Sequence, residues 1–415
     1  MTNTGIAALF FLLLTANAAL GQVKRCIFDE LHKGMVESTG FVEKNRAWAA
    51  LAQSAAKTQA DDAPIITVPI VVHVIHTGGQ DNVAESQIMS QIDVLNEDYR
   101  AKAGSAGALG VDTKIEFCLA KLDPDGNPTS GITRTESPLA EHVQADEAAL
   151  KALIRWDTER YLNIWVVKSI GGEGENRILG YARYPEDPAG LDGVVIAYRN
   201  FGRTGILTPP YNRGRTLTHE IGHSLGLFHP FQGGCLGSLP STCLEFGDNV
   251  CDTPQSLFEA FGCNLGDSAN TCTEYPFDGP DAADNYMNYG NDACMHGFTP
   301  GQAVRMRNVF EIYPHRKKLV SPENLAASGC ATGKKENKAA SVFNARIYPQ
   351  PAADSFTFEV WGEWKMRVYD LAGRIVGEYS GSGTEKVDFN AAPGVYSALI
   401  ETEKELFRRK IVVAR

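Results

Sequence analysis

The chain has 415 residues, of which 43% are hydrophobic, and its formal net charge at pH 7 is -11. This length allows two or three domains with buried cores, and the negative charge argues against nucleic acid or an anionic membrane as the main partner. No transmembrane segment is expected, because no apolar run approaches the roughly 20 residues that a membrane-spanning helix needs.

The N-terminus has the pattern of a secretory signal peptide. A short apolar run from Ala7 to Leu14 is followed by small residues, and cleavage after either Ala18 or Gly21 fits the pattern. The first five residues contain no Lys or Arg, which departs from the usual signal, and a buried N-terminal helix is the alternative. We assign 1–21 as a signal peptide, so we expect a protein that is secreted or attached to the outer cell surface.

The next segment, 22–64, is polar and rich in alanine, with helical stretches such as 42–56 and no strand alternation. We interpret it as a prosegment. The pattern changes at Ile65, since Val68 to His76 form a nearly continuous β-branched run that is typical of a buried strand.

Predicted helices and strands then alternate. Apolar residues at helical spacing predict a helix over 88–99, and a second helix is expected over 146–156. Further strands are predicted at Lys114–Ala120, Tyr161–Lys168 and Gly193–Tyr198. We therefore predict an α/β (α+β) domain with a mixed sheet over 65–327. Its last helix is expected to begin with Thr299 as the cap and Pro300 in the first turn.

The C-terminal part has a different composition. The polar stretch 328–342 contains few apolar residues and is interpreted as a linker. Beyond it, short alternating segments are separated by glycines and a Pro-Gly pair, which predicts a small all-β sandwich over 343–415.

A metal-binding pattern begins at His219, where the chain reads His-Glu-x-x-His-x-x-Gly-x-x-His. Residues four apart share one face of a helix, so His219 and His223 can present two imidazoles to one ion. Gly226 permits the chain to leave the helix, and His229 returns as the third ligand. Glu220 can take a proton from water. Three neutral nitrogens leave a fourth tetrahedral position open, as in catalytic zinc sites.

The alternative is that these are ordinary core histidines. It is disfavoured because three of the nine histidines of the chain fall within these eleven residues. Nine cysteines are also present, and six of them lie between positions 235 and 294. The signal peptide and the absence of a Cys-x-x-Cys pair favour disulfides over a metal cluster. An odd count leaves one thiol over.

Several stretches outside the zinc pattern carry a family resemblance. Met287, within Asn285–Tyr289, fits the methionine turn of the metzincins rather than a simple gap-filling role in the core. The other stretches are Phe117–Ala120, Asp123–Thr133, Gly247–Pro254, Asn291–Cys294 and Phe298–Gln302. Over about 68–316 the chain resembles the pappalysin family of metzincin zinc metallopeptidases. The resemblance implies a metzincin-like catalytic domain with an active-site helix.

The resemblance also implies roles for individual residues. The zinc ligands would be His219, His223 and His229, and Glu220 would be the general base. Tyr289 would approach the metal or hydrogen-bond the tetrahedral intermediate.

Two further positions match the family. Calcium would bind to Asp248 and to the carbonyls of Val250 and Thr253, a ligand set that suits a hard cation, although a plain turn is the alternative. Asp292 would place a carboxylate in the pocket for the residue after the cleaved bond (P1′), which favours Arg or Lys there. A solvated surface carboxylate is the alternative for Asp292.

The resemblance further implies the disulfides Cys235–Cys272 and Cys263–Cys294. For the remaining cysteines we assign, without support from the resemblance, the pairs Cys243–Cys251 and Cys118–Cys330. Cys26 would then be free, and its thiolate could occupy the fourth zinc position and keep the enzyme latent. Asp29 could do the same through its carboxylate, or neither residue has this role. We favour Cys26.

The tail resembles the C-terminal sorting domain of the type IX secretion route of Bacteroidetes. The matching motifs are Tyr348–Ala352, Val368–Arg374, Pro393–Tyr396 and a basic and apolar end. The implied partner is the secretion machinery. A carbohydrate-binding or adhesive module is the alternative, which Trp361 and Trp364 would serve.

These observations predict a monomeric, secreted zinc endopeptidase, made as a latent precursor, that acts on proteins or peptides. One alternative is a surface-attached binding protein with an inactive metal domain, which the complete set of site residues disfavours. Another is a metal-dependent hydrolase of non-peptide bonds, which the glycine-histidine extension and the methionine turn disfavour.

Overall fold

The computed structural model describes most of the chain beyond residue 23. The described residues are 24–36, 38, 40, 41, 43–45, 48, 63–171, 177–235, 243, 247–263, 270–273, 280–331, 346–349, 352–370, 374–402 and 406–414. The predicted signal peptide, most of the predicted helical stretch 42–56 and most of the predicted linker lie outside these residues. The chain divides into two compact units, 1–332 and 333–415.

The first unit is built on a mixed sheet, as predicted. Nine strands of the described part form it, in the order β3-β2-β6-β9-β8-β7-β5, with β4 beside β2 and β1 beside β8. They are β1 (Lys24–Cys26), β2 (Ile66–His76), β3 (Ile115–Leu119), β4 (Ile132–Glu136), β5 (Glu141–His142), β6 (Leu162–Val167), β7 (Ser169–Ile170), β8 (Ile178–Ala182) and β9 (Val194–Ala197). β2 is parallel to β3, β4 and β6, whereas β8 is antiparallel to β9.

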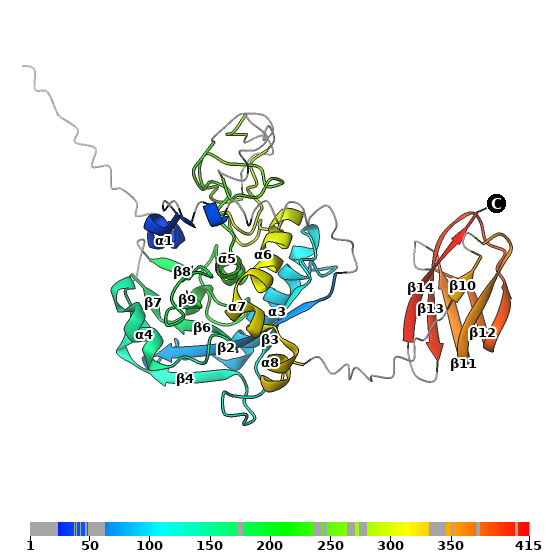
Figure 1. The fold of residues 1–415 in the computed structure, drawn as a ribbon, viewed down its shortest axis with the longest axis horizontal. Coiled ribbons are helices and arrows are strands. Elements are labelled where there is room, and N and C mark those ends of the chain that lie inside the picture. Colours follow the sequence, from blue (N-terminus) through cyan, green and yellow to red (C-terminus); the bar gives the residue numbers. More distant parts are fainter. Residues whose placement is uncertain are drawn as a thin grey trace, which may run out of the picture. The chain divides into compact units, whose positions relative to one another are not determined.

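Helices cover both faces of this sheet (Figure 1). They are α1 (Phe28–Val36), α3 (Glu85–Tyr99), α4 (Glu147–Leu153), α5 (Arg215–Ser224), α6 (Pro300–Ile312), α7 (Pro314–Leu319) and α8 (Pro322–Ala327). Short 3-10 turns lie at Ala106–Leu109, Pro138–Ala140, Gln144–Asp146 and Tyr198–Asn200. Thr299 caps α6 in a reciprocal capping box with Gln302, and Pro300 lies in its first turn, as the sequence predicts.

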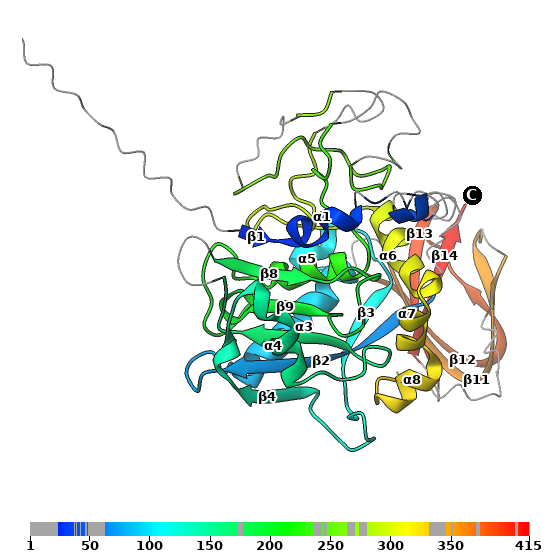
Figure 2. The ribbon, with the colours of Figure 1, turned by 60° about the vertical axis from the view of Figure 1, so that its left-hand side comes forward.

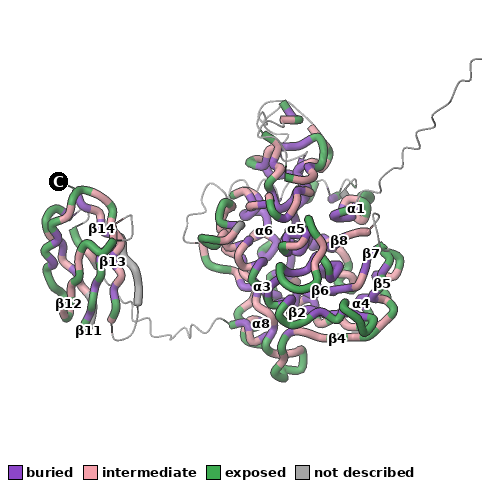
Figure 3. Tube along the Cα trace, turned by 180° about the vertical axis from the view of Figure 1, so that it is seen from behind, coloured by how far each residue is buried: buried purple, intermediate pink, exposed green. Residues whose placement is uncertain are grey.

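The strand residues alternate between two cores. Along β6, Ile164 and Val166 face the larger core, to which α3, α5 and α6 also contribute, whereas Trp165 and Val167 face a smaller core with Leu150 of α4. This alternation follows from the period of two residues in a strand. The central strands are accordingly buried in Figure 3, where they are purple. All ten residues of α5 are buried, so this helix is held rigidly in the larger core.

The second unit is all-β, as predicted, and its described strands form one five-stranded antiparallel sheet. Its strands are β10 (Arg346–Tyr348), β11 (Ser355–Tyr369), β12 (Ile375–Asp388), β13 (Gly394–Thr402) and β14 (Leu406–Val413). They pair in the order β10-β11-β13-β14, with β12 beside β11. Trp364 is 3% exposed and packs in the core of this unit, so it offers no surface to a carbohydrate. The side chain of Trp361 lies outside the described part of the chain.

Candidate metal centre

Three histidine side chains meet at the C-terminal end of α5. His219 and His223 lie one turn apart on the helix, and Gly226 turns the chain with a φ of 84°, so that His229 comes back to the same point. The three Nε2 atoms lie 3.0 to 3.2 Å from one another. All three side chains are fully buried. The predicted ligands are therefore brought together.

In His219 and His223, the hydrogen bond of the outer ring nitrogen, Nδ1, shows that the inner nitrogen, Nε2, carries no proton. His219 Nδ1 donates to the carbonyl of Tyr286 at 2.7 Å, and His223 Nδ1 donates to that of Leu227 at 2.9 Å. A carbonyl only accepts, so these rings carry their proton on Nδ1 and leave Nε2 with a lone pair. Burial, followed by repulsion from His229, holds the pKa of His219 and of His223 well below the usual range. Converging neutral nitrogens with fixed outer hydrogen bonds fit a zinc ion.

Glu220 lies beside the histidines and is also fully buried. Its Oε2 atom accepts from the thiol of Cys26 at 3.4 Å, whereas Oε1 has no hydrogen-bond partner among the described residues. Burial raises the pKa of Glu220 to about 8. The strand β8 makes room for this side chain through Gly180, because a Cβ there would lie 3.1 Å from Glu220 Cγ.

The methionine turn lies directly under α5. Met287 is fully buried, and a Cβ on Gly222 would lie 2.4 Å from its sulfur, so a glycine is required at this point of the helix. The neighbouring Tyr286 supplies the carbonyl that holds His219. The ring of Tyr289 lies 5.1 Å from that of His229, and its hydroxyl donates to the Cys26 carbonyl at 3.4 Å.

An N-terminal segment covers the centre, and the sequence did not predict its strand. β1 pairs in parallel with β8, with Cys26 opposite Gly180, and Figure 2 shows β1 and α1 along β8 and above α5. The Cys26 sulfur belongs to the same cluster as the three histidines, in which all ligand atoms lie within 4.8 Å of one another. Phe28 stacks on His223 with ring centres 3.9 Å apart.

Asp29 takes a different position. Its carboxylate hydrogen-bonds to the outer nitrogen of His229, Nδ1, at 3.0 Å, which is the side of the ring that faces away from the other two histidines. Asp29 therefore contacts His229 from outside the cluster, whereas the Cys26 sulfur lies within it.

Arg25 and Asp292 meet next to the centre. The Arg25 guanidinium donates to Asp292 Oδ1 at 3.3 Å, and neither side chain is exposed. It also bonds the carbonyl of Gly290 and lies 5.0 Å from the centre of the Tyr211 ring. The other oxygen of Asp292 accepts from the backbone N–H of Arg213 at 2.7 Å. Asp292 is thus a buried carboxylate in a pocket that holds an arginine, not a solvated surface group.

The positions expected to bind calcium lie together in a turn. Asp248 is 3% exposed, and its Oδ1 atom accepts from the backbone N–H of Val250 at 3.0 Å. The Val250 carbonyl accepts from the backbone N–H of Thr253 at 3.3 Å. Burial raises the pKa of Asp248 to about 7. This geometry is compatible with a plain turn as well as with a cation.

The eight remaining cysteines form the four expected pairs. They are Cys118–Cys330, Cys235–Cys272, Cys243–Cys251 and Cys263–Cys294. Cys26 is the free cysteine, and it is buried.

A second anchor of the N-terminal segment was missed by the sequence analysis. The Trp48 ring lies 4.2 Å from the Arg305 guanidinium, and Asn45 accepts a hydrogen bond from the same group. A Cβ on Gly226 would lie 2.1 Å from the Trp48 ring, so the segment packs against the turn that carries the chain from His223 to His229. No local pattern around Trp48 indicates these partners.

Taken together, a mixed sheet, a buried helix with two histidines, a third histidine after a glycine turn and a methionine turn define a metallopeptidase of the metzincin class. The family model described as pregnancy-associated plasma protein-A matches residues 146–311. A model of the secretion system C-terminal sorting domain matches residues 346–414.

The chain is similar in sequence to extracellular metalloproteases of other organisms. An extracellular metalloprotease of Pyricularia oryzae is 31% identical over 293 residues, which are 69% of this chain and 88% of that protein. An extracellular metalloprotease of Coccidioides posadasii is 32% identical over 287 residues, which are 67% of this chain and 88% of that protein.

Solved structures extend the similarity. Mature mirolysin of Tannerella forsythia in complex with a cleaved peptide is 37% identical, with a TM-score of 0.55, and 64% of this chain and 99% of that chain are covered. A promirolysin mutant of Tannerella forsythia is 35% identical, with a TM-score of 0.56, and 72% of this chain and 97% of that chain are covered. The chain therefore belongs to the pappalysin family, and it is a secreted metallopeptidase with a C-terminal sorting domain. Within the described residues, no helix has the length and apolar character to cross a membrane.

Proposed function

We propose that this protein is a secreted zinc endopeptidase made as a latent precursor, in which 1–21 is a signal peptide and 22–64 a prosegment. The peptidase domain would begin at residue 65 and extend to residue 332, beyond the expected boundary at 327, because Ser328 and Cys330 are buried and Cys330 is bonded to Cys118. The rest of the expected linker, up to residue 342, and a sorting domain over 343–415 would follow. The observation that carries the proposal is the cluster of three buried histidine nitrogens with the Cys26 sulfur beside them.

A zinc ion held by three neutral imidazoles acts as a Lewis acid that lowers the pKa of water and polarises a carbonyl. The residues of the chain would do the rest. The unpartnered Oε1 of Glu220 would accept the proton of the attacking water and deliver it to the leaving amine. Tyr289, whose ring lies 5.1 Å from that of His229 and whose hydroxyl donates to the Cys26 carbonyl, would donate its hydroxyl hydrogen to the developing oxyanion.

Latency would come from Cys26 rather than from Asp29. The sulfur lies among the inner nitrogens of the histidines, whereas the Asp29 carboxylate contacts only the outer nitrogen of His229. A thiolate is a good zinc ligand, so Cys26 would fill the position that water needs. Removal of the segment that contains β1 and α1 would then open the site.

The pocket around Asp292 supports a preference for arginine, and more weakly lysine, directly after the cleaved bond. Arg25 already places a guanidinium against this carboxylate, one residue away from the sulfur that faces the histidines. A substrate arginine would make the same charge-assisted hydrogen bonds, whereas an ammonium cannot form the bidentate pair.

Calcium at Asp248 is a further part of the proposal. The buried carboxylate has hydrogen bonds from Val250 and Gln302, but no Lys or Arg of the described residues forms an ion pair with it. A buried carboxylate without a cation is costly, and calcium would remove this cost. A calcium chelator should then lower the melting temperature at constant zinc content, with no effect on an Asp248→Asn variant. An unchanged melting temperature in the wild type contradicts the calcium site.

The central test replaces the general base. Glu220→Ala and the isosteric Glu220→Gln should both retain stoichiometric zinc and lose peptidase activity by at least about a thousandfold, since proton transfer is lost while the ligands stay. Zinc content, measured by atomic absorption, separates this result from loss of the metal. Wild-type activity in either variant at equal zinc occupancy sinks the assigned mechanism. No hydrolysis of any protein substrate by the activated wild type would instead favour a binding protein with an inactive metal domain.

A further inference from the structure

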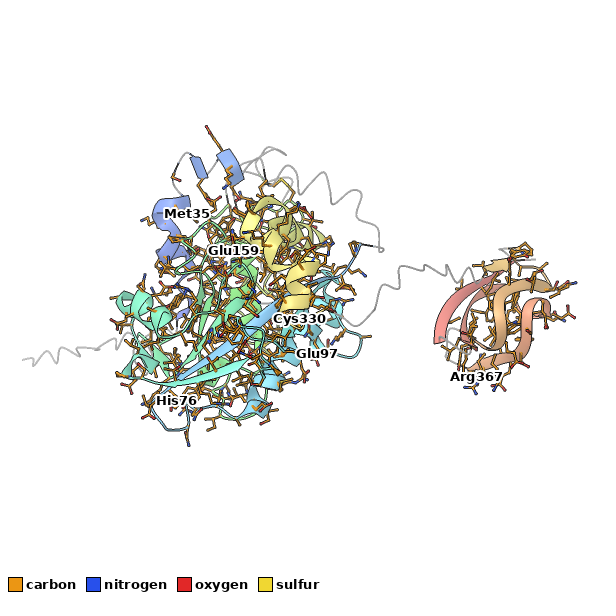
Figure 4. All side chains as sticks on the ribbon, turned by 60° about the horizontal axis from the view of Figure 1, so that its bottom comes forward. Met35, His76, Glu97, Glu159, Cys330 and Arg367 are labelled. Carbon is orange, nitrogen blue, oxygen red and sulfur yellow. A yellow bond between two sulfur atoms is a disulfide. The ribbon has the colours of Figure 1, made fainter. Side chains whose placement is uncertain are left out.

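A cationic cavity lies beside the turn 213–215, whose backbone N–H groups hydrogen-bond to Asp292. Its volume is about 610 Å³. It is lined by Glu97, Lys102, Ala103, Gly104, Ser105, Arg203, Arg213 and Arg215. These residues come from the end of α3, from the turn after it, and from the segment that leads into α5. Glu97 is labelled in Figure 4.

The charges in this cavity do not balance. Arg203 is paired with Glu97, and Arg215 is paired with the buried Asp98 at 3.1 Å. Within the described part of the chain, Lys102 and Arg213 have no carboxylate partner. Both are exposed to solvent. Two cations therefore remain uncompensated in one concave site, where their fields add and attract an anion.

The cavity and the proposed specificity pocket are formed by the same chain segment, 213–215. The N–H groups of Arg213 and Arg215 both donate to Asp292 Oδ2, at 2.7 and 3.3 Å. Between them, Gly214 has a φ of 80°, a conformation that favours glycine. The backbone of this turn thus forms the wall of the Asp292 pocket, while the side chains of Arg213 and Arg215 line the cationic cavity.

We propose that this cavity is a second specificity subsite, which takes the carboxylate of an Asp or Glu on the C-terminal side of the cleaved bond. This inference rests on the proposed function, in which the residue after the cleaved bond enters the Asp292 pocket. An extended chain advances about 3.3 to 3.6 Å per residue. The cavity shares a wall with the Asp292 pocket. The second, third and fourth residues after the cleaved bond are therefore the ones that can reach it.

The test uses the zinc-loaded, activated enzyme and a peptide library with a fluorophore and a quencher. The residue after the cleaved bond is varied, and each of the next three positions carries Glu or the uncharged Gln. At one of these positions Glu should raise kcat/KM about fivefold over Gln, as a partly exposed ion pair allows, mainly through KM. The preference should shrink at high ionic strength.

Variants assign the effect to the cavity. Arg213→Gln and Lys102→Gln should each reduce the ratio of Glu to Gln, and the double variant should bring it close to one. Lys121→Gln, which removes an exposed charge outside the cavity, should leave the ratio unchanged. Equal cleavage of Glu and Gln peptides by the wild type overturns the subsite, as does a preference that survives in the double variant.

The same library keeps the two proposals apart. Loss of the arginine preference with a persistent, Arg213-dependent preference for Glu contradicts only the role of Asp292. The opposite outcome contradicts only the cationic subsite. No cleavage of any peptide contradicts the proposed peptidase function and the subsite together.

Discussion

Arg25 and Asp292 form an ion pair 3.3 Å long in which neither side chain is exposed to solvent. The two residues are 267 positions apart in the chain. Because a buried carboxylate without a partner is costly, Arg25 satisfies Asp292 in this structure. Under the proposed activation, a substrate arginine would take over this contact once the N-terminal segment is removed.

Specificity should change when the charge of Asp292 is removed. Asp292→Asn keeps the shape of the side chain and loses its charge, so selectivity for arginine after the cleaved bond should fall about tenfold to a hundredfold, the range for a hydrogen bond between charged groups. A cleavage-site profile on a peptide library measures this for both proteins. Two outcomes would show that Asp292 does not determine the preference for the residue after the cleaved bond. One is a wild-type profile dominated by hydrophobic residues at that position, and the other is an unchanged arginine preference in the variant.

Latency should depend more on Cys26 than on Asp29. Cys26→Ala should give premature activity or self-cleavage of the precursor, since nothing then fills the fourth position. Asp29→Ala should be much milder, because His229 loses an outer contact but keeps its inner nitrogen in place. Activity of freshly purified precursor, followed over time, ranks the two. The reverse ranking moves the switch to Asp29, and no effect in either variant removes this kind of switch.

The anchor at Trp48 should contribute to latency independently of the metal. Trp48→Ala removes a buried ring from Arg305 and Gly226, which should weaken docking of the segment by about 3 kcal/mol and speed activation by added protease. Glu43→Ala, an exposed position on the same segment, serves as the control. If both variants activate at the wild-type rate, the Trp48 contacts do not contribute to docking, and the contacts of Arg25 and Cys26 hold the segment.

Stability should fall in mild acid through His73 of β2. This ring is 0% exposed, and burial lowers its pKa to about 4. The unfolded chain takes up a proton near pH 6.5, whereas the folded chain does not until about pH 4. Stability from this group is therefore present above pH 6.5 and is lost as the pH falls toward 4.

The effect can be isolated with His73→Gln. Between pH 7 and pH 5 the free energy of unfolding should drop by about 2 kcal/mol less in the variant than in the wild type. Urea unfolding at the two pH values, followed by tryptophan fluorescence, measures the difference. Equal drops in the two proteins would falsify the assignment of acid sensitivity to this ring.

Prediction from sequence succeeded where the determinants are local. The helix with His219 and His223, the glycine turn and the buried run of β2 all follow from spacing and periodicity. The contacts of Arg25 with Asp292 and of Trp48 with Gly226 could not be predicted in the same way. They join segments far apart in the chain, and their partners are decided by tertiary packing. Strand β1 has three residues, too few for an alternating pattern, and it exists because β8 offers a free edge.

The Cys118–Cys330 disulfide spans 212 positions and joins the last residues of the first unit to β3 (Cys330 is labelled in Figure 4). Strand β3 is hydrogen-bonded to the central strand β2. A pulling force applied to the C-terminal unit, during export or on a tethered protein, therefore enters the first unit at Cys330 and passes through a covalent bond into the sheet. The helices α6, α7 and α8, which precede Cys330 in the chain, lie outside this load path and do not have to resist unravelling from their end.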